Sequence, residues 1–163
     1  MKTSSPLLQS QYGLYVECVH HIGEVYYNLP YIYILDRNLN ADHLREAIEM
    51  AVAAHPTLFT RISTDENGEP IQTVDDEETF TLTIEDIDDI DQVQSQLVKP
   101  FNIYEDRLFR IRLFRTPVNY YLFIDYHHLI ADGTSMNLML NEIDRAYCGE
   151  VLEQEQRTLA QQV

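Results

Sequence analysis

One stretch constrains the fold more than any other: residues 120–133, in which an apolar run leads into a polar turn. Residues 120–127 (YYLFIDYH) are apolar almost throughout, which is typical of a strand that is buried on both faces and central in its sheet. The turn that follows carries two adjacent histidines and an aspartate, and helical spacing begins near Thr134. Polar side chains at such a strand-to-helix junction are costly to bury, so they indicate a functional site.

The two histidines of the turn, His127 and His128, cannot act together. Side chains alternate across a strand, so the two imidazoles must point to opposite faces and only one can look into a given cavity. The other must lie inside the layer, where it needs a hydrogen-bond partner. Asp132 lies beyond a short apolar loop and can fold back toward the pair. Gly133 gives the backbone room and leaves an N–H near the start of the next helix.

These residue types predict a particular chemistry. An imidazole is the natural proton acceptor at neutral pH. A backbone N–H at a helix start can face a developing oxyanion, and a buried aspartate needs a cation. Together they suit the attack of an amine or hydroxyl on a thioester. The nucleophile then belongs to the substrate, so the protein needs no serine or cysteine nucleophile.

Two other interpretations of the turn stay open. The histidines can be a structural pair at a strand end, with no catalytic role. A zinc site of His127, His128 and Asp132 is disfavoured, because strand geometry separates the two imidazoles.

The composition excludes several classes of function. The 163 residues amount to one domain, with 27 acidic and 11 basic residues and a net charge of −16. Nucleic-acid binding needs a basic face, so we exclude it, and an anionic membrane surface is disfavoured for the same reason. No apolar run is long enough to predict a membrane span. Cys18 and Cys148 are far apart and lack metal-like spacing, which predicts two reduced thiols and a cytoplasmic location.

Local patterns predict an α/β fold, with a mixed sheet covered by helices. Asn40 is predicted to cap a strong helix, and Pro30 predicts an edge or a bulge in its strand. Residues 1–150 form the predicted domain, and residues 151–163 form a polar tail. The predicted helices are 6–19, 41–54, 90–97 and 134–147; the predicted strands are 24–35, 57–63, 70–74, 79–84, 108–115 and 120–127, with a hairpin at 65–68.

The pattern His-His-x-x-x-Asp-Gly at residues 127–133 resembles the signature of the condensation-domain superfamily of nonribosomal peptide synthetases. This superfamily includes chloramphenicol acetyltransferase. Residues 10–15 are similar to the family's first motif, and residues 54–61 are similar to the second. Residues 100–110 resemble the stretch upstream of the double histidine. The match covers most of the chain, but only the first of the two lobes of a condensation domain.

The resemblance implies a chloramphenicol-acetyltransferase-like lobe with a mixed, mostly antiparallel sheet. It implies that His128 is the general base or positions the acceptor amine, and that His127 is structural. Asp132 would form a buried ion pair that organises the loop. Gly133 would give backbone room or an oxyanion contact, with Ser135 a weaker candidate on the oxyanion side.

The chain departs from the family's second motif, which usually has an arginine where this chain has Phe59 and an acidic residue where it has Pro56. Arg61 lies two residues further on and so projects to the same face of the strand as position 59. We therefore predict that Arg61 pairs with Asp132.

The resemblance implies that the chain is the N-terminal half of a condensation domain, which joins acyl or aminoacyl thioesters in an amide bond. Both substrates would arrive on the phosphopantetheine arms of carrier proteins, with no tightly bound cofactor. The site lies between two lobes in this family, so the chain without its C-terminal lobe is predicted to be inactive or nearly so. The alternatives are a free-standing coenzyme A-dependent acyltransferase of the chloramphenicol acetyltransferase type, and a non-catalytic docking lobe.

Overall fold

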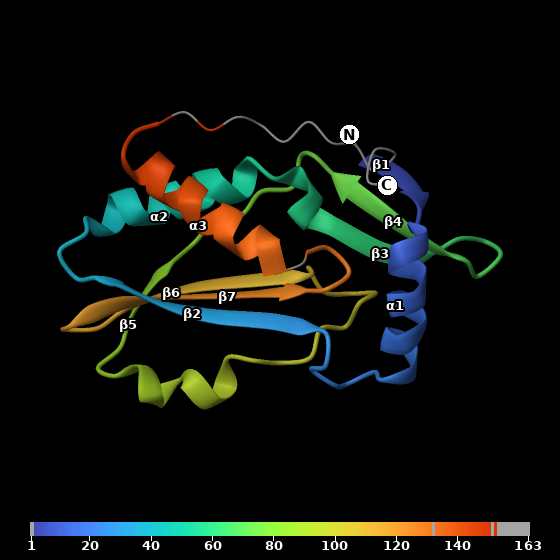
Figure 1. The fold of residues 1–163 in the computed structure, drawn as a ribbon, viewed down its shortest axis with the longest axis horizontal. Helices are drawn as coiled ribbons and strands as arrows, with labels where there is room; N and C mark the ends of the chain where they lie inside the picture. The colour runs from blue at the N-terminus through green and yellow to red at the C-terminus, as the bar shows by residue number, and fades with distance from the viewer. Residues whose placement is uncertain (1, 132, 151, 153–163) are drawn as a thin grey trace.

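The computed structural model of the chain describes residues 2–131, 133–150 and 152, and for residues 133–136 it describes the backbone alone. Two sheets and three α-helices make up this part of the chain (Figure 1). The polar tail predicted at residues 151–163 lies, apart from residue 152, outside the described residues.

The larger sheet has four strands in the order β2-β7-β6-β5. They span Asn28–Asp36 (β2), Asn119–His127 (β7), Phe109–Arg115 (β6) and Ile84–Asp86 (β5). β7 pairs antiparallel with both β2 and β6, and β5 pairs parallel with β6. The predicted central position of β7 is therefore confirmed. Pro30 predicted an edge or a bulge, and β2 lies at the edge of the sheet.

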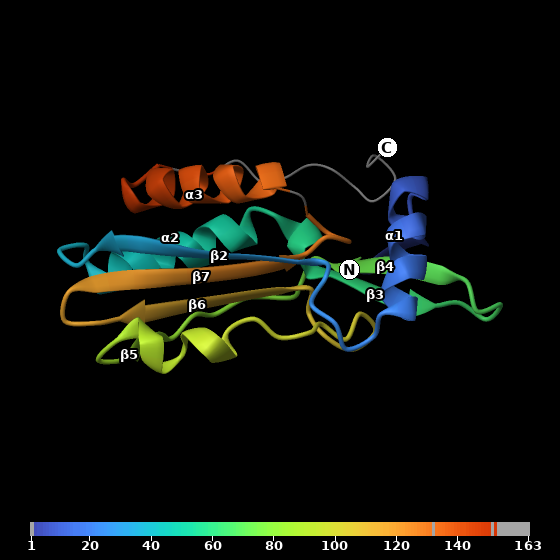
Figure 2. The same cartoon turned by 60° about the horizontal axis from the view of Figure 1, so that its bottom comes forward.

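Two helices cover one face of this sheet: α2 (Ala41–Ala53) and α3 (Gly133–Tyr147) (Figures 1 and 2). Asn40 caps α2 as predicted, because its side-chain oxygen accepts a hydrogen bond from the His43 N–H at 3.0 Å. Alternate β7 residues supply the sheet side of the core: Tyr120, Leu122, Ile124 and Tyr126. The helix side includes the apolar stripe of α2: Leu44, Ala47, Ile48, Ala51 and Val52.

The opposite face is covered by residues 87–103, which lie below the sheet in Figure 2. Two short 3-10 helices, Ile90–Gln92 (η2) and Gln94–Gln96 (η3), replace the predicted helix at 90–97. That prediction was wrong because Val93, between the two turns, has a φ of −121°, outside the α region. Leu97 closes this side of the core with Phe114 and Phe123.

The smaller sheet has the order β1-β4-β3, with both pairs antiparallel. Its strands are Lys2–Pro6 (β1), Pro70–Asp75 (β4) and Thr60–Thr64 (β3), and a 3-10 helix, Pro56–Phe59 (η1), leads into β3. The predicted hairpin between β3 and β4 is confirmed, with Gly68 at a φ of +78° in its turn.

Helix α1 spans Gln9–His20 and stands beside this smaller sheet (Figure 1). It starts later than the predicted Pro6, because residues 2–6 are drawn into β1 by pairing with β4. The predicted strand at 79–84 was wrong for residues 79–83, because β5 begins only at Ile84 and runs to Asp86. The backbone N–H of Leu82 donates to the carboxylate of Glu49 in α2 at 2.8 Å, so it does not pair with a neighbouring strand.

Candidate functional site

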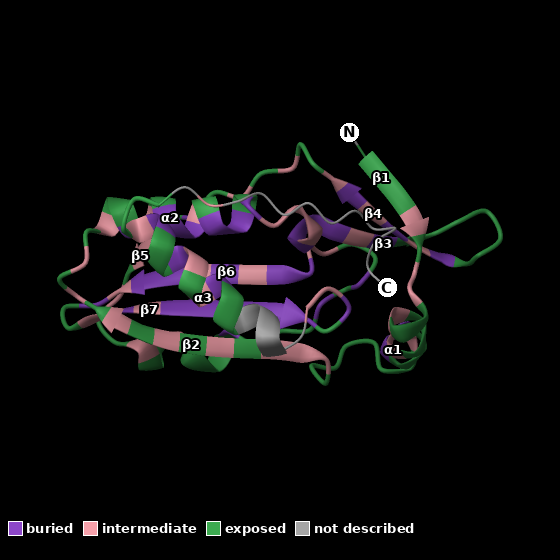
Figure 3. Cartoon of the chain, turned by 45° about the horizontal axis from the view of Figure 1, so that its top comes forward, coloured by how far each residue is buried: buried purple, intermediate pink, exposed green. Residues whose placement is uncertain are grey.

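The end of β7 places His127 inside the molecule. Its backbone N–H donates to the carbonyl of Leu108 at 2.9 Å, which keeps the strand end attached to the chain leading into β6. The side chain is only 4 % exposed. It lies on the sheet face away from α2 and α3, among residues of the core cluster that includes Cys18 and Phe101. Figure 3 shows β7 buried along almost its whole length.

Two contacts fix the protonation state of His127. The Leu129 N–H donates to Nδ1 at 3.0 Å, so Nδ1 carries no hydrogen. The neutral ring then has its hydrogen on Nε2, which lies 3.6 Å from the Sγ of Cys18 and donates to it. Burial lowers the pKa of His127 to about 4, and the neighbouring charge of His128 adds to the effect. At neutral pH this imidazole is uncharged and held in one tautomer.

Cys18, the partner of His127, is also uncharged. It is 6 % exposed, and burial raises the pKa of its thiol to about 11, with a further contribution from the charge of Glu17. The contact is therefore a thiol next to a neutral imidazole. A thiolate–imidazolium pair, as a nucleophilic cysteine requires, is not favoured here.

His128 lies just beyond the strand end and is exposed. Its backbone N–H donates to the carbonyl of Tyr27 at 2.9 Å, which ties the turn to the segment before β2. The Ile130 N–H donates to the His127 carbonyl at 3.0 Å and closes the turn. One histidine is thus buried at the strand end, and its neighbour is exposed on the turn that follows.

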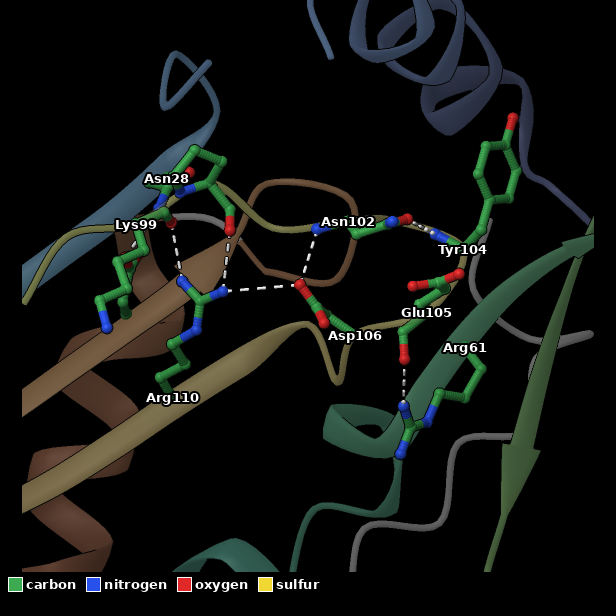
Figure 4. Close-up of polar contacts among 10 residues, drawn as sticks. Asn28, Arg61, Lys99, Asn102, Tyr104, Glu105, Asp106 and Arg110 are labelled. Carbon is green, nitrogen blue, oxygen red and sulfur yellow. Dashed lines mark hydrogen bonds and ion pairs between the residues drawn. The ribbon is translucent and has the colours of Figure 1, made fainter. Parts of the chain in front are cut away.

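The other predicted site residues are only partly visible. Asp132 lies outside the described residues, Gly133 is the first residue of α3, and the side chain of Ser135 is not described. The predicted ion pair between Arg61 and Asp132 therefore stays a prediction. Arg61 has other partners. Its Nη2 lies 3.2 Å from a carboxylate oxygen of Glu78. Its Nη1 donates to the Glu105 carbonyl at 3.3 Å, as Figure 4 shows.

A second guanidinium, that of Arg107, covers Phe59, which stands where the family resemblance implies an arginine. The Cζ atom of Arg107 lies 5.2 Å from the ring centroid of Phe59 and 5.3 Å from that of Phe109, so the guanidinium stacks over both rings. It also lies 3.2 Å from Glu78, so this carboxylate receives both Arg61 and Arg107.

The sequence interpretation missed Asp125, two residues before His127. Its side chain is fully buried, and burial raises its pKa against the opposing effects of Asn28 and Arg110. Asn28 Nδ2 donates to Oδ2 at 2.8 Å. Oδ1 has no hydrogen-bond partner within the part of the chain that the structure describes. One signal was available: Asp125 is the single acidic residue in the apolar run 120–127.

Two hollows in the described part of the chain lie away from this turn. One, of about 570 Å³, is lined by α2 and residues 76–80, including Met50, Phe59 and Phe80. Another, of about 410 Å³, lies at the far end of the larger sheet beside Arg37 and Arg115. His128 lines neither of them and lies at the surface.

Solved structures of condensation domains have the same fold. The first condensation domain of the CDA synthetase aligns with a TM-score of 0.75 at 19% identity, over 94% of this chain and 43% of that one. The starter condensation domain of rhizomide synthetase gives a TM-score of 0.77 at 16% identity, over 94% and 40%. The condensation domain from the monacolin K polyketide synthase gives 0.79 at 17%, over 94% and 36%. The chain therefore has the fold of part of a condensation domain.

The family follows from the sequence match. The profile of the Condensation domain family matches residues 1–162, so the chain belongs to this family. One plipastatin synthase protein of Bacillus subtilis (strain 168) is 30% identical over 145 residues, which is 87% of this chain and 4% of that protein. Surfactin synthase subunit 2 of the same organism is 29% identical over 150 residues, 90% of this chain and 4% of that protein. The chain thus spans a small fraction of these curated relatives.

Two other properties concern membranes and metals. Among the residues that the structure describes, no helix has the length and apolar character needed to cross a bilayer. Within the same residues, no three histidine, cysteine or acidic side chains gather as metal ligands.

Proposed function

We propose that the chain is the N-terminal half of a condensation domain that forms amide bonds in nonribosomal peptide synthesis. The observation that carries the proposal is the contrast between the two histidines at the end of β7. His127 is buried, neutral and held in one tautomer, whereas His128 is exposed on the adjacent turn. Family membership supports the same interpretation.

In the proposed reaction an acceptor amine attacks the carbonyl carbon of a donor thioester. A C–N bond forms and the C–S bond breaks, so the products are an amide and a thiol. His128 positions the amine and takes the proton that nitrogen loses, and the departing sulfur gains a proton. Gly133, at the start of α3, provides backbone room or an N–H for the oxyanion, and Asp132 organises the loop. His127 does no proton transfer and holds the turn in place.

The donor and the acceptor are proposed to arrive on the phosphopantetheine arms of carrier proteins, with no tightly bound cofactor and in the cytoplasm. The chain covers 36–43% of the solved condensation domains described above, which supports the need for a second half. His128 is exposed at the surface of the described chain, which supports a site completed by another lobe. By itself the chain is proposed to be inactive or nearly so.

The test is reconstitution of a complete domain. The chain would be joined to the second half of a condensation domain and supplied with one carrier bearing an acyl donor and another bearing an aminoacyl acceptor. Mass spectrometry of the carrier-bound product measures amide formation. We expect His128→Ala to lose at least about a hundredfold in rate, the range that general acid–base catalysis supplies.

The matched control is His43→Ala, at the start of α2, which should leave the rate unchanged. The fold of each variant is checked by circular dichroism. Full activity in a folded His128→Ala protein would contradict the proposal. Acetyl transfer from acetyl-CoA by the chain alone, as a trimer on light scattering, would contradict it in favour of the acyltransferase alternative.

A further inference from the structure

We infer that Asp125 is a positioning residue for His128: through Asn28 it holds the strand segment that fixes the His128 backbone. The inference rests on the proposed function only for the importance of His128. The contacts themselves connect strands β2, β7 and β6 with the loop at residues 99–101.

The first link joins Asp125 on β7 to Asn28 on β2. In the register of these strands Asn28 is opposite His127, and Pro30 is opposite Asp125. Asn28 is thus the diagonal neighbour of Asp125 on the sheet, within reach of its side chain. Asn28 Nδ2 donates one hydrogen to Asp125 Oδ2 at 2.8 Å and the other to the Lys99 carbonyl at 2.9 Å.

The second link carries this constraint to the histidine turn. Tyr27, whose carbonyl accepts the His128 N–H at 2.9 Å, directly precedes Asn28. A side chain that fixes Asn28 therefore also fixes the carbonyl that receives the His128 amide. Free rotation of the Asn28 segment would release that amide, and with it the backbone that carries the imidazole.

The third link holds the loop from the side of β6. Arg110 is opposite Asp125 in the register of β6 and β7. Its Nη1 donates to the Lys99 carbonyl at 2.7 Å and its Nη2 to the Pro100 carbonyl at 2.9 Å, and the guanidinium lies 3.9 Å from the ring centre of Phe101. Figure 4 shows this guanidinium directed at Lys99 and at the carboxylate of Asp106, which is 3.6 Å away.

The same loop also touches the buried histidine, because the Phe101 ring packs edge-on against His127 with centroids 5.8 Å apart. In this loop, close to the double histidine, the Lys99 carbonyl accepts hydrogen bonds from both Asn28 and Arg110. Burying the Asp125 carboxylate with no partner for Oδ1 in the described chain costs folding free energy, so this residue is poorly explained by stability alone. Its contacts explain Asp125 instead as the hydrogen-bond acceptor that orients the Asn28 side chain.

The experiment measures backbone amide hydrogen exchange by NMR in the 163-residue chain, so it needs no catalytic activity. Asp125→Ala should raise exchange of the His128 amide by about tenfold or more relative to the Leu122 amide in the middle of β7, because local opening is then decoupled from global unfolding. Asp125→Asn keeps an oxygen acceptor for Asn28 and should restore most of the protection. Asn40→Ala, which removes a distant helix cap, should leave the ratio unchanged.

If Asp125→Ala does not fold, Asn28→Ala gives the same comparison by removing the donor instead of the acceptor. A His128-to-Leu122 ratio within about twofold of the parent value would overturn the inference, because exchange would then report global stability alone. Failure of the proposed function would appear separately, as full activity of a folded His128→Ala protein in the reconstituted domain.

Discussion

The imidazole Nε2 of His127 lies 3.6 Å from the Sγ of Cys18, across the contact between the end of β7 and helix α1. These residues are 109 positions apart in the chain, and both are buried. The contact links the larger sheet to the helix that stands beside the smaller sheet. It also uses the single N–H hydrogen of a neutral His127.

The burial of Cys18 predicts a difference in thiol reactivity. Cys148 is exposed whereas Cys18 is buried, with a pKa raised to about 11, and alkylation requires an accessible thiolate. We expect iodoacetamide at neutral pH to modify Cys148 in the folded protein and to modify both residues in denaturant. Peptide mass spectrometry identifies the sites. Equal labelling of the two cysteines in the folded state would contradict the buried contact with His127.

His127 predicts a pH dependence of stability. Its pKa is about 4 in the folded chain, against about 6.5 when unfolded, so the unfolded chain binds the proton first. The contribution of His127 to the free energy of unfolding is fully present above pH ~6.5 and is lost as the pH falls toward ~4. At 1.36 kcal/mol per pKa unit, this loss amounts to about 3 kcal/mol. Urea titrations across this range measure the free energy of unfolding.

The comparison that isolates this effect is His127→Gln, which cannot gain the proton. It should be less stable than the parent at pH 7 and should have a shallower loss of stability between pH ~6.5 and ~4, where the parent histidine titrates only when unfolded. His43→Gln, at the start of α2, should keep the parent's slope. Identical slopes for the parent and His127→Gln would show that His127 is accessible to protons in the folded state.

Arg61→Ala separates two partners for this arginine. The Arg61 side chain is 41% exposed and forms an ion pair with Glu78, and losing an exposed pair should cost no more than about 1 kcal/mol in the free energy of unfolding. We expect this small cost. A cost of about 3–5 kcal/mol would instead favour the predicted buried pair with Asp132, because it would leave a buried charge alone. Chemical denaturation measures the free energy of unfolding of the two single variants, Arg61→Ala and Glu78→Ala, and distinguishes the two results.

Asn40→Ala should remove the cap of α2 and cost about 1 kcal/mol, since the His43 N–H loses its side-chain acceptor. Asn40→Asp retains an oxygen acceptor and serves as the control, with a stability close to that of the parent. Thermal unfolding followed by circular dichroism measures both. Equal losses in the two variants would show that the Asn40 amide group matters in some way other than as a cap.

The parts of the fold that could be predicted from sequence are those where local chemistry and tertiary packing agree. The run 120–127 is apolar on both faces, so its central place in the sheet followed from burial alone. Asn40 and the stripe of α2 gave that helix its start and its buried face. The burial of His127 was expected for one histidine of the pair at the end of this strand.

The remaining features depend on partners that are distant in sequence. Residues 2–6 are polar and show no strand pattern. They form β1 because their backbone pairs antiparallel with that of β4. Residues 90–97 have helical spacing, but Val93 leaves the α region and they form two short turns. Glu78 as the partner of Arg61, and Asn28 as the partner of Asp125, could not be chosen among 27 acidic residues or several amides without the topology.

The outer position of β2 has a consequence for work with the purified chain. This nine-residue strand lies at the edge of the larger sheet, and its residues Ile32 and Ile34 are 37% and 66% exposed. A long apolar edge strand is a template for pairing between molecules, and Pro30 interrupts only one position of its backbone ladder. Aggregation at high concentration would therefore begin at this edge, and a lysine substituted for Ile34 is the change that best protects a sample from it.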